Sequence, residues 1–473
     1  MKFNIGKSGG VKGVLVFEND IKTEYLKYLK DKEIFSGKAE EVHYYIDSNM
    51  KEYLFIGLGE ESKIDYDILR KTFYNVNNTL LKNKVDEVEL NIPKLNNLCN
   101  YRIAQAISEG MLQATYKYDK FKGDRKEVNE IVVNYIPVSG KEERAEKGIN
   151  ESINLVESIF LARDLVNQPA NVIYPETLAQ IAKEKLEKNG VKVTIYGKKE
   201  IEDLNMAAYL SVARASAKEP KLIVMEYYNN PESDERFALV GKGLTYDSGG
   251  YAIKPATSMV DMFTDMGGAG TVIGAMNALS GMNAKVNVVG IVAACENMIS
   301  GDGYRNGDII NSMSGKTIEI VNTDAEGRLT LADAVYYAAN NLGATKLIDL
   351  ATLTGACVMA FGEQVSGVVT NNDEFFKKLE EATFKAGEIV WKMPNIEYYK
   401  KMNDSKVADI KNTGGKFGGM ITAGLFVGSF IGKEIPWIHI DIAGTAYISK
   451  SYGYLKEGAT GTLVKSLYYL LSE

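Results

Sequence analysis

The sequence of 473 residues predicts an α/β fold built in two parts. Over residues 1–140, short apolar runs alternate with Lys- and Glu-rich segments of helical character. The same alternation returns, richer in glycine, from about residue 170. The stretch between the two parts predicts a single helix. We therefore expect an N-terminal α/β domain at 1–140, a linking helix at 141–165 and a second α/β domain at 166–473.

Local patterns predict the individual elements. In the first part, four apolar runs predict strands: GVLVFEN, EYLFIGLG, EVELNIP and EIVVNYIP. The linking helix is marked by an apolar stripe at Ile149, Ile153, Val156 and Phe160, and it ends before Pro169. In the second part, the predicted strands are RFALVGKG, KVNVVGIVAAC, KLIDLATLTG and WIHIDIAG. The helices between and beside them are DMGGAGTVIGAMNAL, LTLADAVYYAAN and GGMITAGLFVGSFIG.

Composition argues against several classes of protein. Apolar residues make up 45% of the chain and charged residues 25%, which is typical of a soluble globular protein. The net charge of −7 argues against nucleic acid or an anionic membrane as the main partner. Three widely spaced cysteines without a CxxC pair, and no signal-peptide core at the N-terminus, favour a reducing, cytoplasmic location. The uncharged run at 266–284 contains five glycines and predicts a buried helix rather than a membrane span.

Histidine is scarce, since the sequence contains only His43 and His439. A site of two or three histidines would need both of them or more than exist, and a Ser–His–Asp triad would need one of them. We expect His43 to be exposed and His439, which alternates with Trp437 and Asp441, to be packed within a strand. Hydrolytic chemistry in this chain would therefore use mostly carboxylates, lysine and arginine.

Polar residues occur at the ends of predicted strands in the second part. VGKGLTYDSGGYAIKP carries Lys242, Asp247 and Lys254, and Asp265 precedes a predicted helix. Neighbouring glycines would allow backbone or ligand to approach closely. Because sites in open α/β sheets form at the carboxyl ends of the strands, these side chains could converge. Taken singly, Asp265 is equally explained as a helix N-cap and the lysines as solvated side chains.

The stretch NTDAEGRLTLADAV at residues 322–335 adds Asp324, Glu326 and Arg328. If the segment is extended, side chains two residues apart share a face, and all three would point at one spot. The alternative is a surface Glu–Arg pair at a helix start, where acidic residues suit the helix dipole. Both interpretations fit the segment on its own.

Convergence of these acidic residues would place four carboxylates in one pocket. They would repel one another and take up protons unless cations balanced them. Two divalent metal ions would provide that balance. Oxygen ligands favour Mg²⁺ or Mn²⁺, and zinc also accepts carboxylates. A metal pair can activate water and polarise a carbonyl group, while Lys254 and Arg328 would remain for an oxyanion or another anion.

These motifs resemble those of the leucine aminopeptidases, also called cytosol aminopeptidases. NTDAEGRL is similar to the family's signature, and VGKGLTYDSGGYAIKP with DMGGAG to its metal-binding segment. LARDLVNQPAN resembles the start of its catalytic domain, and VADIKNTGG, WIHIDIAG and GATG its C-terminal part. The resemblance covers about 160–465 and implies a larger α/β/α catalytic domain with a central mixed sheet. The N-terminal third is similar only in size and α/β character.

The resemblance implies a cofactor of two divalent metal ions per subunit, Zn²⁺ or Mn²⁺. Lys242, Asp247, Asp265 and Glu326 would hold the tighter ion. Asp247, Asp324 and Glu326 would hold the more exchangeable one, assisted by the Asp324 carbonyl group.

The remaining roles implied by the resemblance concern the substrate. Lys254 would polarise the scissile carbonyl group and stabilise the oxyanion, and Arg328 would hold a bicarbonate that acts as general base. The pocket for the first side chain would be lined by Met262, Asn322, Thr352, Gly355 and Ala443. Departures from the family pattern, including Tyr246 for phenylalanine and a small Ala446, bear on substrate preference.

The expected function is a cytoplasmic two-metal aminopeptidase, forming a homohexamer, that removes leucine-like N-terminal residues from peptides. A dipeptidase acting on Cys-Gly or similar peptides would use the same residues. Two alternatives belong to other classes: a DNA-binding regulatory role in addition to peptidase activity, and a metal-binding scaffold without turnover. The acidic net charge weighs against nucleic acid as a partner.

Overall fold

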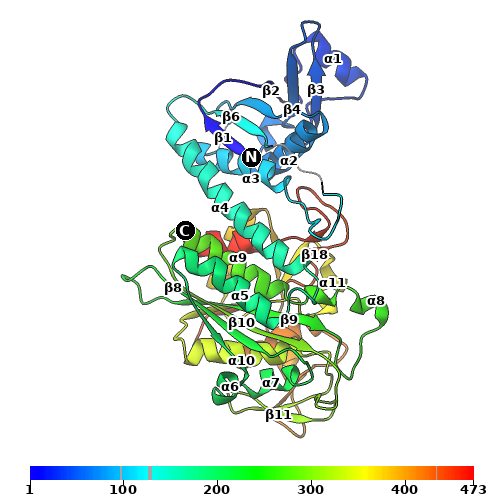
Figure 1. Cartoon of the computed structure of the whole chain (residues 1–473), viewed down its shortest axis with the longest axis vertical. Coiled ribbons are helices and arrows are strands. Elements are labelled where there is room, and N and C mark those ends of the chain that lie inside the picture. Colours follow the sequence, from blue (N-terminus) through cyan, green and yellow to red (C-terminus); the bar gives the residue numbers. More distant parts are fainter. Residues whose placement is uncertain (96–97, 126–129, 433, 473) are drawn as a thin grey trace. The chain divides into compact units, whose positions relative to one another are not determined.

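The computed structural model describes residues 1–473 except 96–97, 126–129, 433 and 473. The chain forms two compact units, Met1–Glu157 with Ser451–Leu455, and Ser158–Lys450 with Lys456–Glu473. Helix α4, Glu142–Asn167, begins in the first unit and ends in the second (Figure 1). The two-part α/β organisation expected from the sequence is confirmed, and the boundaries at 140 and 165 stay a prediction.

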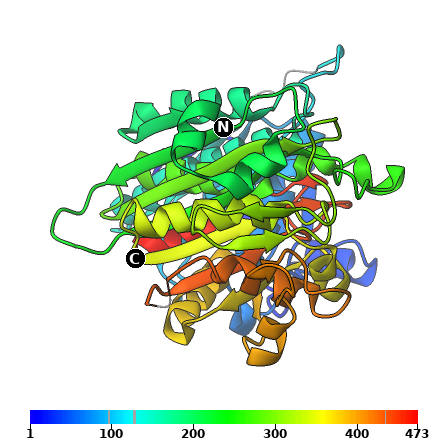
Figure 2. The same ribbon diagram turned by 90° about the horizontal axis from the view of Figure 1, so that it is seen from below.

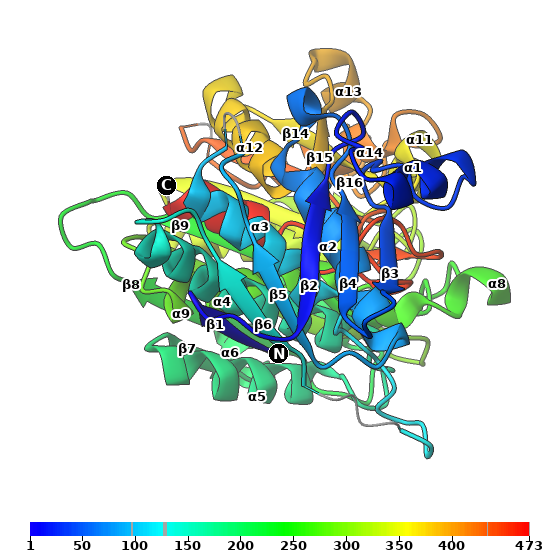
Figure 3. The ribbon, with the colours of Figure 1, turned by 90° about the horizontal axis from the view of Figure 1, so that it is seen from above.

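The first unit is built on a six-stranded sheet in the order β1-β6-β5-β2-β4-β3 (Figure 3). Neighbouring strands are parallel except the edge pair β3 and β4. The strands are β1 Lys2–Ile5, β2 Val11–Val16, β3 Val42–Ile46, β4 Glu52–Gly57, β5 Glu87–Asn91 and β6 Val132–Ile136. The helices are α1 Glu24–Asp31, α2 Tyr66–Lys82 and α3 Asn100–Gln113, with the 3₁₀ helix η1 Glu61–Lys63. Alternate residues of β4, Leu54 and Ile56, face a core shared with Phe73 of α2.

The second unit is built on a mixed eight-stranded sheet in the order β15-β14-β17-β13-β9-β10-β8-β7. Its central strands β17, β13, β9 and β10 are parallel, whereas β14, β8 and β7 each run antiparallel to an inner neighbour. The strands are β7 Lys192–Tyr196, β8 Lys221–Tyr228, β9 Phe237–Asp247, β10 Asn287–Asn297, β13 Lys346–Ala351, β14 Val365–Thr370, β15 Ile389–Lys392 and β17 Trp437–Asp441. The expected mixed sheet is confirmed.

Helices cover both faces of this sheet (Figures 1 and 2). α5 Pro175–Leu186 and α9 Gly267–Gly281 pack on one face, and α7 Ala207–Ala213 and α10 Gly327–Asn340 on the other. Because β9 and β10 are buried on both faces, their sequences are largely apolar along their length. α9 is buried along nearly its whole length, as the uncharged run predicted. In the part of the chain that the structure describes, no helix has the length and apolar character needed to cross a membrane.

Smaller elements complete the second unit. Two small sheets contain β11 Ile309–Asn311, β12 Thr317–Glu319 and β16 Ile410–Lys411, and β18 Tyr447–Ile448 and β19 Gly458–Ala459. The other helices are α6 Lys198–Asp203, α8 Ala256–Met259, α11 Gly355–Phe361, α12 Asp373–Ala386, α13 Glu397–Lys401, α14 Gly419–Gly428 and α15 Val464–Ser472, with the 3₁₀ helices η2 Glu187–Asn189 and η3 Met262–Thr264.

The two histidines have structural surroundings. His439 is fully buried in β17, and its Nδ1 atom lies 2.6 Å from Oδ1 of Asp349, so the expected packed strand histidine is confirmed. His43 of β3 is half-buried rather than exposed, because its Nε2 atom lies 3.2 Å from the hydroxyl of Tyr25. The expectation of an exposed His43 is therefore wrong.

A buried carboxylate of α10 connects three segments of the second unit and predicts a measurable loss of stability. Asp333 is fully buried and accepts hydrogen bonds from the backbone amides of Tyr209 at 3.0 Å and Met313 at 2.8 Å. Asp333→Ala would leave both amides without this acceptor, so we expect the free energy of unfolding to fall by about 2–4 kcal/mol. Urea unfolding followed by tryptophan fluorescence measures this, because Trp391 and Trp437 both belong to the second unit.

Asp333→Asn is the matched control, since its carbonyl oxygen can keep one acceptor in place and should give a smaller loss. An unfolding midpoint for Asp333→Ala equal to that of the wild type would contradict a stabilising role of this carboxylate.

Candidate active site

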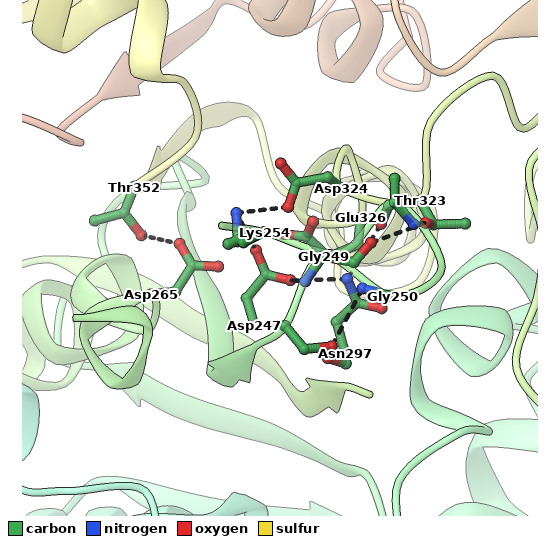
Figure 4. Close-up of polar contacts among 12 residues, drawn as sticks. Asp247, Gly249, Gly250, Lys254, Asp265, Asn297, Thr323, Asp324, Glu326 and Thr352 are labelled. Atoms are coloured by element: carbon green, nitrogen blue, oxygen red, sulfur yellow. Dashed lines mark hydrogen bonds and ion pairs between the residues drawn. The ribbon is translucent and has the colours of Figure 1, made fainter. Parts of the chain in front are cut away.

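The carboxyl ends of the central parallel strands bring several polar side chains together (Figure 4). Lys242 lies within β9 and Asp247 is its last residue. Asn297 is the last residue of β10 and pairs with Asp247 across the two strands. Thr352 directly follows β13. The site therefore forms at the carboxyl ends of the strands, where open α/β folds place their sites.

The segment that begins at Asn322 is a turn followed by a helix, not an extended strand. The amide of Ala325 donates to the carbonyl group of Asn322, and α10 starts directly after Glu326. The expectation that Asp324, Glu326 and Arg328 share one face of a strand is therefore wrong. The alternative of a surface pair is also wrong, because Glu326 is 1% and Arg328 7% exposed.

The ammonium group of Lys242 is buried among the acidic residues of the site. Its Nζ atom is 2.6 Å from Oδ2 of Asp265 and 3.0 Å from Oε1 of Glu326, and it donates to the carbonyl group of Thr352 at 3.0 Å. The first residue of α10 is Gly327, and a Cβ atom there would lie 2.4 Å from Cε of Lys242, so a larger residue would displace the lysine side chain from its present position. The start of α10 thus packs directly against the Lys242 side chain.

Lys254 forms a second, more accessible ion-pair group. Its Nζ atom lies 2.8 Å from Oδ2 of Asp247 and 2.5 Å from Oδ1 of Asp324 (Figure 4). The side chains of Lys254 and Asp324 are 15% and 32% exposed, so this group lies toward solvent. Gly249 allows the loop to pass close by, since its φ is +84° and a Cβ atom would lie 2.9 Å from Oδ1 of Asp324.

Three buried carboxylates approach closely enough to share a cation. One oxygen atom each from Asp247, Asp265 and Glu326 lies within 4.8 Å of the others. Asp265 does not act as the N-cap of α9, because that position is Met266; its carboxylate instead accepts from the hydroxyl of Thr352 at 2.8 Å. The donor set consists of oxygen atoms with one lysine amine nearby, which is chemistry suited to a divalent ion.

The ionisation of the site reflects burial and close charges. Burial raises the pKa of Asp247 to about 6, with Glu326 adding to the effect and the lysines opposing it. Burial also raises the pKa of Asp265 to about 8 against the Lys242 ammonium. Burial acts in the same direction on Glu326, but Lys242 and Lys254 outweigh it and lower its pKa. Burial alone would lower the pKa of Lys242 and of Lys254, but the adjacent carboxylates outweigh burial and raise both pKa values.

Arg328 contributes a buried positive charge beside this cluster. Burial lowers the pKa of its guanidinium to about 10, so the group stays charged at neutral pH; Glu326 and Asp441 oppose the shift. Within the described part of the chain, its Nε atom has no hydrogen-bond partner. A buried guanidinium with a free donor is suited to holding an anion.

The carboxylate of Asp441 connects two segments that carry predicted pocket residues. It accepts from the amide of Leu353 at 3.2 Å and the hydroxyl of Thr354 at 2.6 Å, between the predicted residues Thr352 and Gly355. It also accepts from the amide of Ala443 at 3.1 Å. Asp441 thereby holds the loop after β13 next to the loop after β17.

The other two predicted pocket residues lie on separate elements. Met262 is half-buried and begins the 3₁₀ helix η3. The side-chain oxygen of Asn322 accepts from the amide of Asp324 at 2.9 Å, so this side chain supports its own turn.

Two polar residues that the sequence motifs did not single out belong to the site. Asn297 donates through Nδ2 to Oδ1 of Asp247 at 2.8 Å. Thr323 donates through its hydroxyl to the carbonyl group of Gly249 at 2.8 Å. Asn297 lies two residues beyond the predicted strand KVNVVGIVAAC, and a polar residue so close to a strand end is the sequence signal that marks it.

Sequence comparisons match both parts of the chain. Models of the cytosol aminopeptidase family match residues 160–468 for the catalytic domain and 12–125 for the N-terminal domain, where the motifs alone showed little. The chain is 77% identical to a probable cytosol aminopeptidase of Treponema denticola, covering 100% of both chains. It is 50% identical to one of Clostridium tetani, covering 99% of this chain and 98% of the relative.

Solved structures agree with this match. The bottromycin maturation enzyme BotP has a TM-score of 0.89 at 28% identity, covering 98% of this chain and 99% of that chain. The same enzyme in complex with Mn has a TM-score of 0.90. A mutant of tomato leucine aminopeptidase has a TM-score of 0.88 at 32% identity, covering 100% of this chain and 96% of that chain. The chain belongs to the cytosol aminopeptidase family and is a metallo-aminopeptidase.

Proposed function

We propose that this metallo-aminopeptidase uses two divalent ions to remove leucine-like residues from the N-termini of peptides. The observation that carries the proposal is the convergence of Asp247, Asp265 and Glu326, whose oxygen atoms lie within 4.8 Å of one another. Buried carboxylates this close repel one another unless cations compensate. Two lysine ammonium groups balance only part of the charge of these three groups and Asp324.

The geometry supports a division of the ligands between two ions. Lys242, Asp247, Asp265 and Glu326 would hold the tighter ion, since all four are almost fully buried. Asp247, Glu326 and the partly exposed Asp324 would hold the more exchangeable one. Lys242 would become a ligand only after losing its proton, which adjacent divalent charge favours. Bound Zn²⁺ or Mn²⁺ would lower the pKa of a water molecule and polarise the peptide carbonyl group.

Two cationic side chains would serve the reaction directly. Lys254 lies beside the carboxylates with part of its side chain exposed, a position from which it can stabilise an oxyanion on the substrate. Arg328 would hold bicarbonate, which would take the proton of the attacking water as general base. The free Nε donor of its buried guanidinium supports this assignment.

Substrate recognition would involve the pocket of the first side chain. Its proposed lining is Met262, Asn322, Thr352, Gly355 and Ala443. Ala446 lies near the proposed pocket, since a Cβ atom on Gly267 would lie 3.0 Å from side-chain carbons of both Ala446 and Thr352, and its small side chain would bear on which first residues are admitted. A dipeptidase acting on Cys-Gly would use the same catalytic residues and differ in this pocket.

We also propose a cytoplasmic homohexamer. Large apolar side chains of the second unit are exposed, among them Met359 at 89%, Phe384 at 86% and Phe417 at 70%, and association of subunits through them would bury this apolar surface. The net charge of −7 disfavours nucleic acid as an additional partner.

Lys254→Ala tests the oxyanion role. The substitution removes a charge that acts mainly on the transition state, so kcat should fall by about 10²–10³-fold, as on loss of an oxyanion donor. Metal content per subunit, measured by elemental analysis, should stay at the wild-type value. The matched control is Lys285→Ala, which removes an exposed lysine paired with Glu232 and should leave kcat unchanged. A near-normal kcat for Lys254→Ala would assign this lysine a structural role only.

Blocking the substrate's N-terminus tests exopeptidase function. We expect cleavage of Leu-amide and Leu-Gly, but none of acetyl-Leu-amide, because an acetylated nitrogen cannot coordinate a metal ion as a free amine does. Rates should rise between about pH 6 and pH 8 as the α-amine, with a pKa of about 8, loses its proton. Mass spectrometry of a long peptide with and without its N-terminal block makes the measurement.

The same peptide digestion should stop after chelation and resume when Mn²⁺ or Zn²⁺ is returned. Internal cleavage of the blocked peptide would refute the proposal, as would full turnover by metal-free protein.

A further inference from the structure

Asn297 forms a hydrogen bond to one oxygen atom of the Asp247 carboxylate. Its fully buried side chain donates through Nδ2 to Oδ1 of Asp247 at 2.8 Å and to the carbonyl group of Thr323 at 3.1 Å. The amide of Gly249 donates to the same oxygen atom at 2.9 Å. Oδ1 of Asp247 therefore accepts from two protein donors, while Oδ2 lies 2.8 Å from Nζ of Lys254.

The hydroxyl of Thr323 joins two segments of the site (Figure 4). It donates to the carbonyl group of Gly249 and accepts from the amide of Ala252, both at 2.8 Å. These two residues lie in the loop that ends at Lys254, whose amide bonds to the carbonyl group of Ser248. Thr323 itself directly precedes Asp324. One buried hydroxyl thus fixes the Lys254 loop against the segment that carries two acidic site residues.

We propose that Asn297 and Thr323 are positioning residues of the aminopeptidase reaction, an inference that rests on the proposed function. Asn297 holds the Asp247 carboxylate so that Oδ2 is presented to the metal ions. Thr323 holds the Lys254 loop so that the ammonium group stays at a fixed place beside Asp247 and Asp324. Neither residue is assigned a direct contact with the substrate or the metal ions.

The physical basis is that both interactions are buried and directional. Hydrogen bonds to a metal-binding carboxylate fix its orientation, and their loss commonly weakens metal binding by about 10–100-fold. A small displacement of a group that acts in the transition state lowers turnover by up to about 100-fold. Asn297 should therefore act on metal affinity and Thr323 on kcat.

The first experiment replaces Thr323 in the full chain. Thr323→Val keeps the shape and removes the hydroxyl, so with Leu-amide and Mn²⁺ we expect kcat to fall by about 10–100-fold, with KM and metal content little changed. Thr323→Ser restores the hydroxyl and should recover most of the lost kcat. The matched control is Thr177→Val, because the Thr177 hydroxyl likewise donates to a carbonyl group, that of Val172, and accepts from an amide, that of Tyr174, in a segment distant in the sequence from the site residues.

The second experiment titrates Mn²⁺ alone into metal-free Asn297 variants by calorimetry. Asn297→Leu and Asn297→Ala both lose the Nδ2 donor without adding a charge, so each should bind Mn²⁺ about 10–100-fold more weakly than the wild type. Two variants are used so that one misfolded protein, recognised by circular dichroism, does not end the test.

The outcomes separate this inference from the function on which it rests. A folded Thr323→Val protein with wild-type kcat, or folded Asn297 variants with wild-type Mn²⁺ affinity, would overturn the corresponding positioning role while wild-type turnover persisted. Absence of aminopeptidase turnover in Mn²⁺-loaded wild-type protein would instead overturn the proposed function.

Discussion

The negative charge of four acidic side chains at the carboxyl ends of the central strands must be balanced by positive charge, and this requirement constrains the whole second unit. Asp247, Asp265 and Glu326 are almost fully buried, and their repulsion would disrupt the fold if nothing opposed it. Lys242 and Lys254 oppose it in the protein alone, each between two carboxylates. Because the two lysines offset only part of the negative charge of the four carboxylates, bound cations would stabilise the site further.

The scaffold meets this constraint by placing rigid elements around the cluster. The central strand β9 carries Lys242 and ends at Asp247, so both residues lie toward the carboxyl ends of the parallel strands. Helices packed on both faces of the sheet keep water away from its interior. The start of α10 approaches so closely that a Cβ atom on Gly327 would displace the Lys242 side chain. Charges held in such a dry, fixed environment interact more strongly than they would in water, and this is the environment that a reaction with a developing oxyanion requires.

The strands and the acidic residues of the site could be predicted because burial and strand-end position leave clear signals in the sequence. Lys242 and Asp247 stand out as polar residues in an otherwise apolar run. The segment carrying Asp324 was misjudged, because spacing two residues apart fits an extended strand as well as the turn and helix start that the structure contains. Asn297 carries a sequence signal only in its position at a strand end, and the roles of Asn297 and Thr323 could not be predicted, since a single amide or hydroxyl gains a role only through partners distant in the sequence. The roles assigned to individual site residues stay predictions.

The central claim is that this cluster binds two divalent ions shared by Asp247 and Glu326. Crystals of the protein soaked in Mn²⁺ and measured by anomalous X-ray diffraction test it most directly. We expect two anomalous peaks per subunit, both adjacent to Asp247 and Glu326, one next to Asp265 and the other next to Asp324. A single peak at saturating Mn²⁺, or peaks only outside this cluster, would contradict it.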